Sequence, residues 1–83
     1  MRITVKTAGP LGKYLPAGSR ANLAELDIAE GDTPIDVMRT LGMPEDRTYL
    51  VVLNGENLPK AQRPNTQLSE DDELAIMPPL KGG

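Results

Sequence analysis

The chain has 83 residues, enough for one small domain, with nine Lys and Arg against twelve Asp and Glu and a net charge of −3. This balance argues against non-specific nucleic-acid binding, which needs a positive field. The lack of Cys and His excludes disulfides, thiolate or imidazole metal sites and the commonest catalytic bases. No segment approaches the ~20 apolar residues of a membrane span, and the first residues lack the apolar core of a signal peptide. We therefore expect a soluble cytoplasmic protein that binds no nucleic acid, membrane or metal.

The first third of the chain predicts two strands. Polar and apolar side chains alternate over residues 2–7, which indicates a strand with Ile3 and Val5 facing the core. Residues 11–21 contain Gly, Pro and Ser and are typical of a loop. Alternation returns over residues 22–28, which predicts a second strand paired with the first as a loose hairpin.

A helix is predicted to begin after Thr33. The Thr33 hydroxyl suits the N-cap, Pro34 suits the first helical position, and the Asp36 carboxylate suits the positive end of a helix. Gly42 and Pro44 provide the stop. Asp32 and Asp36 could instead be paired catalytic carboxylates, but capping explains them better. The apolar spacing predicts one buried stripe, made of Ile35, Met38 and Leu41.

Residues 49–53 form an unbroken apolar run that predicts a strand apolar on both faces. Asn54-Gly55 is a strong tight-turn pair, after which residues 56–58 could form a short paired strand. Tyr14 and Tyr49 are interpreted as packing residues.

The remaining third of the chain predicts one loop and one strand. Proline interrupts the polar residues 59–69, which indicates a loop anchored by Leu68. The acidic run 70–73 could be taken for a calcium-ligand set, but it lacks the oxygen spacing and glycine of a calcium loop, so a solvated turn is favoured. Residues 73–77 alternate and predict the last strand.

This order of elements predicts an α+β fold, with one main helix packed on one face of a mixed, four- to five-stranded sheet. We expect residues 1–77 to form the domain and residues 78–83 a flexible tail. The other face of the sheet would be open and available to a partner; alternatively, its apolar residues are covered by the 59–69 loop or are scattered surface residues. The candidates for that face are Leu50, Val52, Ala75 and Met77.

The sequence ends in Pro78-Pro79-Leu80-Lys81-Gly82-Gly83. The prolines end strand pairing and extend the backbone, and ordering a Gly-Gly pair is costly in entropy. Such a pair suits a terminus that threads into a narrow channel of another protein, where no Cβ crowds the terminal carboxylate. The alternative is a frayed, solvated tail. Lys81 could meet an acidic groove or phosphates of a partner, or only add solubility.

A terminal carboxylate can take part in covalent chemistry without His or Cys in its own chain. Joining it to AMP gives an acyl adenylate with a good leaving group, and a partner's persulfide can then attack the carbonyl carbon and leave a thiocarboxylate on Gly83. In this interpretation no cofactor is bound, and a partner supplies ATP, magnesium and sulfur.

The chain resembles the MoaD/ThiS family of ubiquitin-like sulfur carrier proteins. The resemblance is carried by residues 51–56, by the ending 72–83 and, less strongly, by residues 14–16 and the helix start. It implies a β-grasp fold and adenylation of Gly83 by a ubiquitin-activating-like enzyme, with Gly82 as the required neighbour.

The Pro-Pro-x-x-Gly-Gly ending is most similar to that of the small subunit of molybdopterin synthase, a co-substrate rather than an enzyme on its own. This likeness implies a large synthase subunit, or another sulfur-accepting synthase, as a partner, with sulfur passing to molybdopterin. The tail contacts would be Pro78, Pro79, Leu80 and Lys81, and the docking patch would include Leu50, Val52 and Met77. Alternatives are a carrier for thiamine or another thiolation pathway, a protein modifier joined to lysines, and an interaction module with an inert tail.

Overall fold

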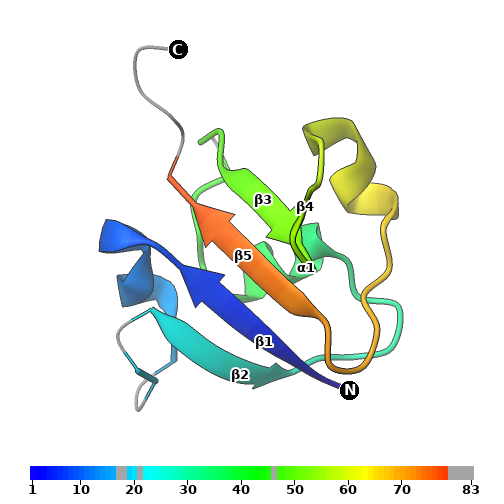
Figure 1. The fold of residues 1–83 in the computed structure, drawn as a ribbon, viewed down its shortest axis with the longest axis horizontal. Coiled ribbons are helices and arrows are strands. Elements are labelled where there is room, and N and C mark those ends of the chain that lie inside the picture. The colour runs from blue at the N-terminus through cyan, green and yellow to red at the C-terminus, as the bar shows by residue number, and fades with distance from the viewer. Residues whose placement is uncertain (17–18, 21, 46, 79–83) are drawn as a thin grey trace.

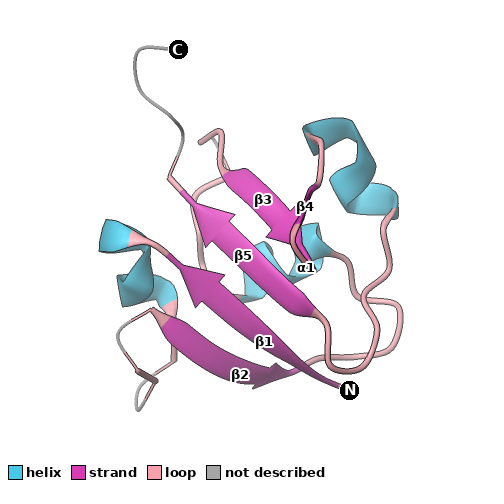
Figure 2. Cartoon of the chain, viewed as in Figure 1, coloured by secondary structure: helices cyan, strands magenta, loops and turns pink. Residues whose placement is uncertain are grey.

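The structure is a computed structural model that describes residues 1–16, 19–20, 22–45 and 47–78. Its centre is a five-stranded mixed sheet with the strand order β2-β1-β5-β3-β4 (Figure 1). The strands are β1 (Arg2–Thr7), β2 (Leu23–Asp27), β3 (Leu50–Leu53), β4 (Glu56–Asn57) and β5 (Glu73–Met77). The helices are α1 (Pro34–Thr40) and two 3₁₀ helices, η1 (Gly9–Tyr14) and η2 (Lys60–Asn65) (Figure 2). No helix in the described ranges is long and apolar enough to cross a membrane.

The sheet is mixed because two of its three interior strands run in the same direction. β1 and β5 are parallel, with Val5 opposite Leu74, whereas β1–β2, β3–β5 and β3–β4 are antiparallel. Parallel neighbours need a long crossover, and here it spans almost the whole chain and includes α1. The predicted α+β class, the hairpin of the first two strands and the single main helix are confirmed.

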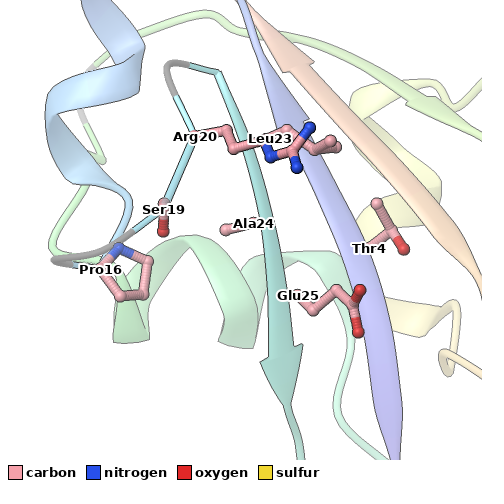
Figure 3. A pocket seen from close by; sticks show the side chains of 7 residues that line it. All are labelled: Thr4, Pro16, Ser19, Arg20, Leu23, Ala24 and Glu25. Carbon is pink, nitrogen blue, oxygen red and sulfur yellow. The ribbon is translucent and has the colours of Figure 1, made fainter.

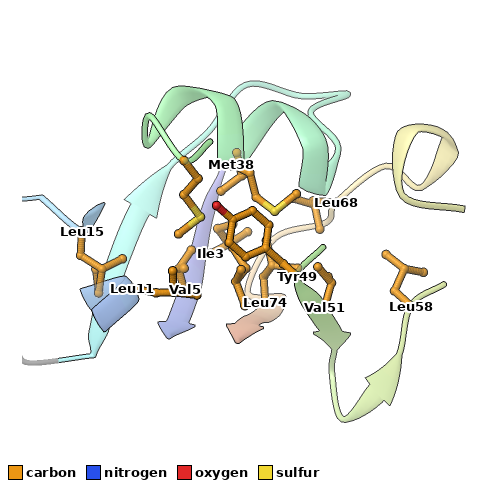
Figure 4. Close-up of a cluster of buried hydrophobic side chains, with 14 residues drawn as sticks. Ile3, Val5, Leu11, Leu15, Met38, Tyr49, Val51, Leu58, Leu68 and Leu74 are labelled. Atoms are coloured by element: carbon orange, nitrogen blue, oxygen red, sulfur yellow. The ribbon is translucent and has the colours of Figure 1, made fainter. Parts of the chain in front are cut away.

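The core lies between the sheet and α1 (Figure 4). Ile3 and Val5 of β1 and Leu74 and Ile76 of β5 are at most 1% exposed, as strand alternation requires. The Tyr49 ring is buried in the middle of this cluster, and its hydroxyl donates a hydrogen bond to the Pro44 carbonyl oxygen over 3.0 Å. A buried phenol needs such a partner.

Helix α1 begins as predicted, but its buried side differs from the predicted one. The Thr33 hydroxyl accepts a hydrogen bond from the Asp36 amide, and the Asp36 carboxylate accepts one from the Thr33 amide. Met38 is buried, whereas Ile35 and Leu41 are only half-buried. The buried line runs instead through Pro34, Val37 and Met38. The prediction placed the stripe about one residue away, because spacing alone does not fix how a short helix is rotated against its sheet.

Two segments predicted to be loops contain 3₁₀ helices. Within the first, η1 buries Leu11; within the second, η2 buries Arg63 and has Pro64 inside it. Each of these 3₁₀ helices has six residues, too few to produce a periodic apolar pattern. The predicted anchor is confirmed: Leu68 is 4% exposed, and its amide donates to the Asp32 carbonyl oxygen.

The turn after β3 is linked to the acidic turn before β5. Asn54 and Gly55 have φ angles of 51° and 85°, the left-handed pair that a tight hairpin requires. The Asn54 side chain donates to Asp72 Oδ1 over 2.9 Å and accepts from the Glu73 amide over 2.8 Å. Asp72 Oδ2 accepts from the Ser69 amide. The acidic run is thus a turn whose carboxylate oxygens accept hydrogen bonds from the Ser69 amide, the Asn54 side chain and the Arg2 amide.

Candidate partner-binding face

One face of the sheet carries no helix from the described part of the chain. Helix α1 packs on the opposite face, and η2 packs against α1 rather than over the sheet (Figure 1). The 59–69 segment therefore does not cover the open face, and the interpretation that buried its apolar residues beneath that segment is wrong.

Four half-buried apolar side chains meet on this face, and we call them the open-face patch. Leu50 pairs with Met77, and Val52 pairs with Ala75, so the four belong to adjacent strands β3 and β5. They alternate along their strands with the buried Val51, Leu74 and Ile76, which puts them on the other side of the sheet. Their predicted placement is confirmed.

Leu23 is an apolar residue of this face that the sequence analysis did not select. Its exposed fraction is 38%, and it lies across β1 from the open-face patch, with Lys6 between it and Ala75. Figure 3 shows it at the start of β2, with Arg20 close by. Leu23 occupies the same side of β2 as Glu25 and Asp27, so the alternation of that strand could have identified it.

Ion pairs occupy much of the rest of the open face. Arg2 pairs with Glu25 over 3.5 Å and with Asp27 over 3.3 Å, and Lys6 Nζ lies 3.2 Å from Glu73 Oε2. The hydrogen bond and charge of Asp27 raise the pKa of the Arg2 guanidinium above its ordinary value. Exposed pairs of this kind add little stability. The face is thus divided into a solvated ion-pair half and an apolar half.

The apolar half lies at the end of the sheet where β5 finishes and the chain leaves the domain. Met77 is the last residue of β5 and belongs to the open-face patch, and the half-buried Pro78 follows it. The other predicted site residues, Pro79, Leu80, Lys81, Gly82 and Gly83, lie outside the described residues, and their roles stay predictions.

The described carboxylates near α1 have structural roles. Asp32 Oδ2 accepts a hydrogen bond from the Ala29 amide over 3.0 Å. Hydrogen bonds from the backbone and the side chain of Thr33 lower the pKa of Asp36. Within the described ranges, no three His, Cys, Asp or Glu residues gather to hold a metal. The described face therefore offers shape and apolar area for binding rather than groups for acid–base chemistry.

The chain is similar to known proteins in both its family and its fold. Residues 16–83 match the ThiS family. SAMP1 from Haloferax volcanii aligns over 100% of both chains with 23% identity and a TM-score of 0.68. A chain from the complex of subunits 1 and 2 of the molybdopterin-converting factor of Helicobacter pylori aligns over 100% of both chains, with 18% identity and a TM-score of 0.64. No curated protein sequence matches the chain.

A further structural neighbour is a ubiquitin-like protein from Caldiarchaeum subterraneum, with 18% identity, a TM-score of 0.50 and coverage of 99% of this chain and 100% of that one. At such identities the structures establish the fold, which is the ubiquitin-like β-grasp. The family match covers most of the sequence, including both strands of the open-face patch. The chain therefore belongs to the ThiS family and has the β-grasp fold predicted for it.

Proposed function

We propose that the chain is a sulfur carrier whose terminal Gly83 is adenylated and then converted to a thiocarboxylate. The observation that carries the proposal is the ThiS family match, which extends through Gly82 and Gly83. Residues 1–77 serve as the docking domain and residues 78–83 as the arm that enters partner enzymes. The protein is consumed and regenerated as a co-substrate.

The chemistry needs two steps on the Gly83 carboxylate. A ubiquitin-activating-like partner, using ATP and magnesium, forms the acyl–AMP bond and releases pyrophosphate. A persulfide sulfur then attacks the carbonyl carbon, and AMP leaves with the electron pair of the broken C–O bond. A second thiol of the donor cleaves the S–S bond, forms a disulfide and leaves the thiocarboxylate on the carrier.

The open-face patch supports this proposal because it lies beside the start of the arm. A partner that binds Leu50, Val52 and Met77 is positioned at the point where the chain leaves β5. Burying half-exposed apolar side chains supplies affinity in addition to the contacts of the arm. Pro78, Pro79, Leu80 and Lys81 then make contacts along the channel, and Gly82 and Gly83 enter its narrow end.

The favoured acceptor pathway is molybdopterin synthesis, with a large synthase subunit as the partner. It is supported by the likeness in fold to the Helicobacter pylori factor, whose two subunits form a complex, and by the Pro-Pro-x-x-Gly-Gly ending. A second candidate is a protein modifier that is joined to lysines. It is favoured by the likeness in fold to SAMP1, which is named small archaeal modifier protein 1.

Intact-mass spectrometry tests these functions. The purified chain is incubated with the activating enzyme of its own organism, ATP, magnesium and a persulfide donor. A carrier gains the mass difference between one sulfur and one oxygen atom, located by fragmentation at Gly83. A modifier gives adducts of much higher mass in cell extract. An unchanged mass in both assays would contradict both functions and favour an interaction module with an inert tail.

A further inference from the structure

A pocket lies on the helix side of the sheet, away from the open face. It is formed where the start of η2 packs against α1 and the segment that follows α1, and it measures about 210 Å³. We call it the α1–η2 pocket. Its floor is apolar and its rim is cationic, and its lining residues include Met38, Met43, Tyr49, Arg47, Lys60 and Arg63.

The deepest charge in this pocket is Arg63. The residue is 7% exposed, and its Nε donates to the Leu58 carbonyl oxygen over 2.9 Å. Burial lowers the pKa of its guanidinium, and no described carboxylate forms an ion pair with it. Charges this buried are usually paired, so an acidic group of a ligand could form an ion pair with the Arg63 guanidinium.

The rim strengthens the positive field. Arg39, Arg47 and Lys60 are exposed around the same opening. Glu45 is the one carboxylate among the described lining residues, and it pairs with Arg39 over 3.1 Å. The described part of the chain contains no carboxylate that forms an ion pair with Arg47 or Lys60. A protein of net charge −3 thus presents a locally cationic surface, which attracts and orients an acidic partner.

The floor of the pocket selects an apolar group. Met38, Met43 and Tyr49 are buried beneath the opening, and methionine side chains adapt to differently shaped partners. The volume is below the ~300 Å³ at which small-molecule sites begin. It suits one protein side chain better than a nucleotide or a cofactor.

We propose that the α1–η2 pocket binds an acidic peptide segment of a partner protein. One apolar side chain of that segment enters the pocket, and the flanking carboxylates pair with Arg63, Arg47 and Lys60. This site is separate from the open face, so it goes beyond the sulfur-carrier function and does not depend on it. A partner could hold the domain here while the open face and the arm stay accessible.

Titration of the ¹⁵N-labelled chain with a synthetic peptide, Asp-Asp-Leu-Glu-Glu, tests the proposal by NMR. We expect amide shifts at Ile35, Met43, Arg47 and Lys60, and affinity that falls as salt rises. The double variant Arg47→Glu/Lys60→Glu should bind about tenfold more weakly. Both side chains are exposed, and the spectrum of the variant itself reports whether it is folded.

Two controls separate this site from general charge attraction. Lys13→Glu/Arg20→Glu makes the same charge change at two exposed positions outside the pocket, and we expect its affinity to stay within about twofold of the original. A peptide with Gly in place of Leu should bind about tenfold more weakly, since it loses the apolar anchor. The proposal would be overturned if no amide shifted at millimolar peptide, or if the shifts were confined to the open face. It would also be overturned if the Gly peptide bound equally well, or if inorganic phosphate displaced the peptide fully.

Discussion

Thr33 and Asp36 bind each other's backbone at the first turn of α1. The Asp36 amide donates to the Thr33 hydroxyl over 3.3 Å, and the Thr33 amide donates to the Asp36 carboxylate over 2.9 Å. A seven-residue helix is not stable by itself in water, so each satisfied amide at its start matters. This capping box explains why the sequence alone located the start of the helix.

We predict that Thr33→Ala lowers the free energy of unfolding by about 1 kcal/mol, because it removes the oxygen that accepts from the Asp36 amide. Urea denaturation followed by circular dichroism measures the change. Thr33→Ser keeps that oxygen and should lose much less. Equal losses for the two variants would show that the methyl group of Thr33, not its hydroxyl, provides the stabilisation.

We predict that the Asp36 carboxylate makes the free energy of unfolding depend on pH. Hydrogen bonds from Thr33 lower its pKa below the ordinary value of 3.8, so the folded state favours the ionised form. The stabilisation is complete above the unfolded pKa and is lost as the pH falls through the folded pKa. The stability difference between wild type and Asp36→Asn should therefore be constant near neutral pH and shrink below about pH 4. Urea denaturation over a pH series measures it, and a difference that grows on acidification would contradict the lowered pKa.

Other features of single residues could not be predicted from the neighbouring sequence. Arg63 is buried by contacts of η2, and nothing in a polar, proline-interrupted segment distinguishes it from an exposed arginine. The same holds for the α1–η2 pocket, whose lining residues are up to 28 positions apart in the chain, from Ile35 to Arg63. Asn54-Gly55 is the opposite case, since its left-handed φ angles follow from the two residue types alone.

Adjacent residues of strand β3 lie on opposite faces of the sheet. Val51 is fully buried against the core, whereas Val52 is half-buried on the open face. Both faces of this strand are apolar, so its sequence does not say which face is open. The pairing with β5 and the position of α1 decide it.

This pair of valines provides a matched test at the level of the strand. Val51→Ala should lower the free energy of unfolding by about 2 kcal/mol, because it empties part of the core. Val52→Ala makes the same change in the same strand and should cost less than about 1 kcal/mol. Urea denaturation of both variants measures the difference. Equal costs would place Val52 in a packed core and contradict an open face.

The whole molecule is asymmetric, with helices on one face of the sheet and a divided open face on the other. Apolar side chains gather where β5 ends, and ion pairs gather toward the other end of the sheet. We predict that Val52→Glu weakens binding of the proposed synthase or activating partner at least tenfold, because a carboxylate would be buried in the apolar contact. Isothermal titration calorimetry measures the affinity.

Gln67→Glu is the control for this prediction. It adds the same charge at an exposed position between η2 and β5, beside the Leu68 anchor and away from the patch. Its partner affinity should match that of the wild type. Stability loss in Val52→Glu should stay within about 1 kcal/mol, and a larger loss, or equal weakening by Gln67→Glu, would contradict a specific role for the patch.

The amino-acid sequence by itself determined the strands with alternating side chains, the capped start of α1, the Asn54-Gly55 turn and the Gly-Gly ending. Each depends on residues within a few positions of one another, so local physics suffices. Only the tertiary structure decided the rotation of α1 about Val37, the placement of η2 away from the open face, and the assembly of four cations around one pocket. These features arise from contacts between distant segments, whose geometry depends on how the whole core packs.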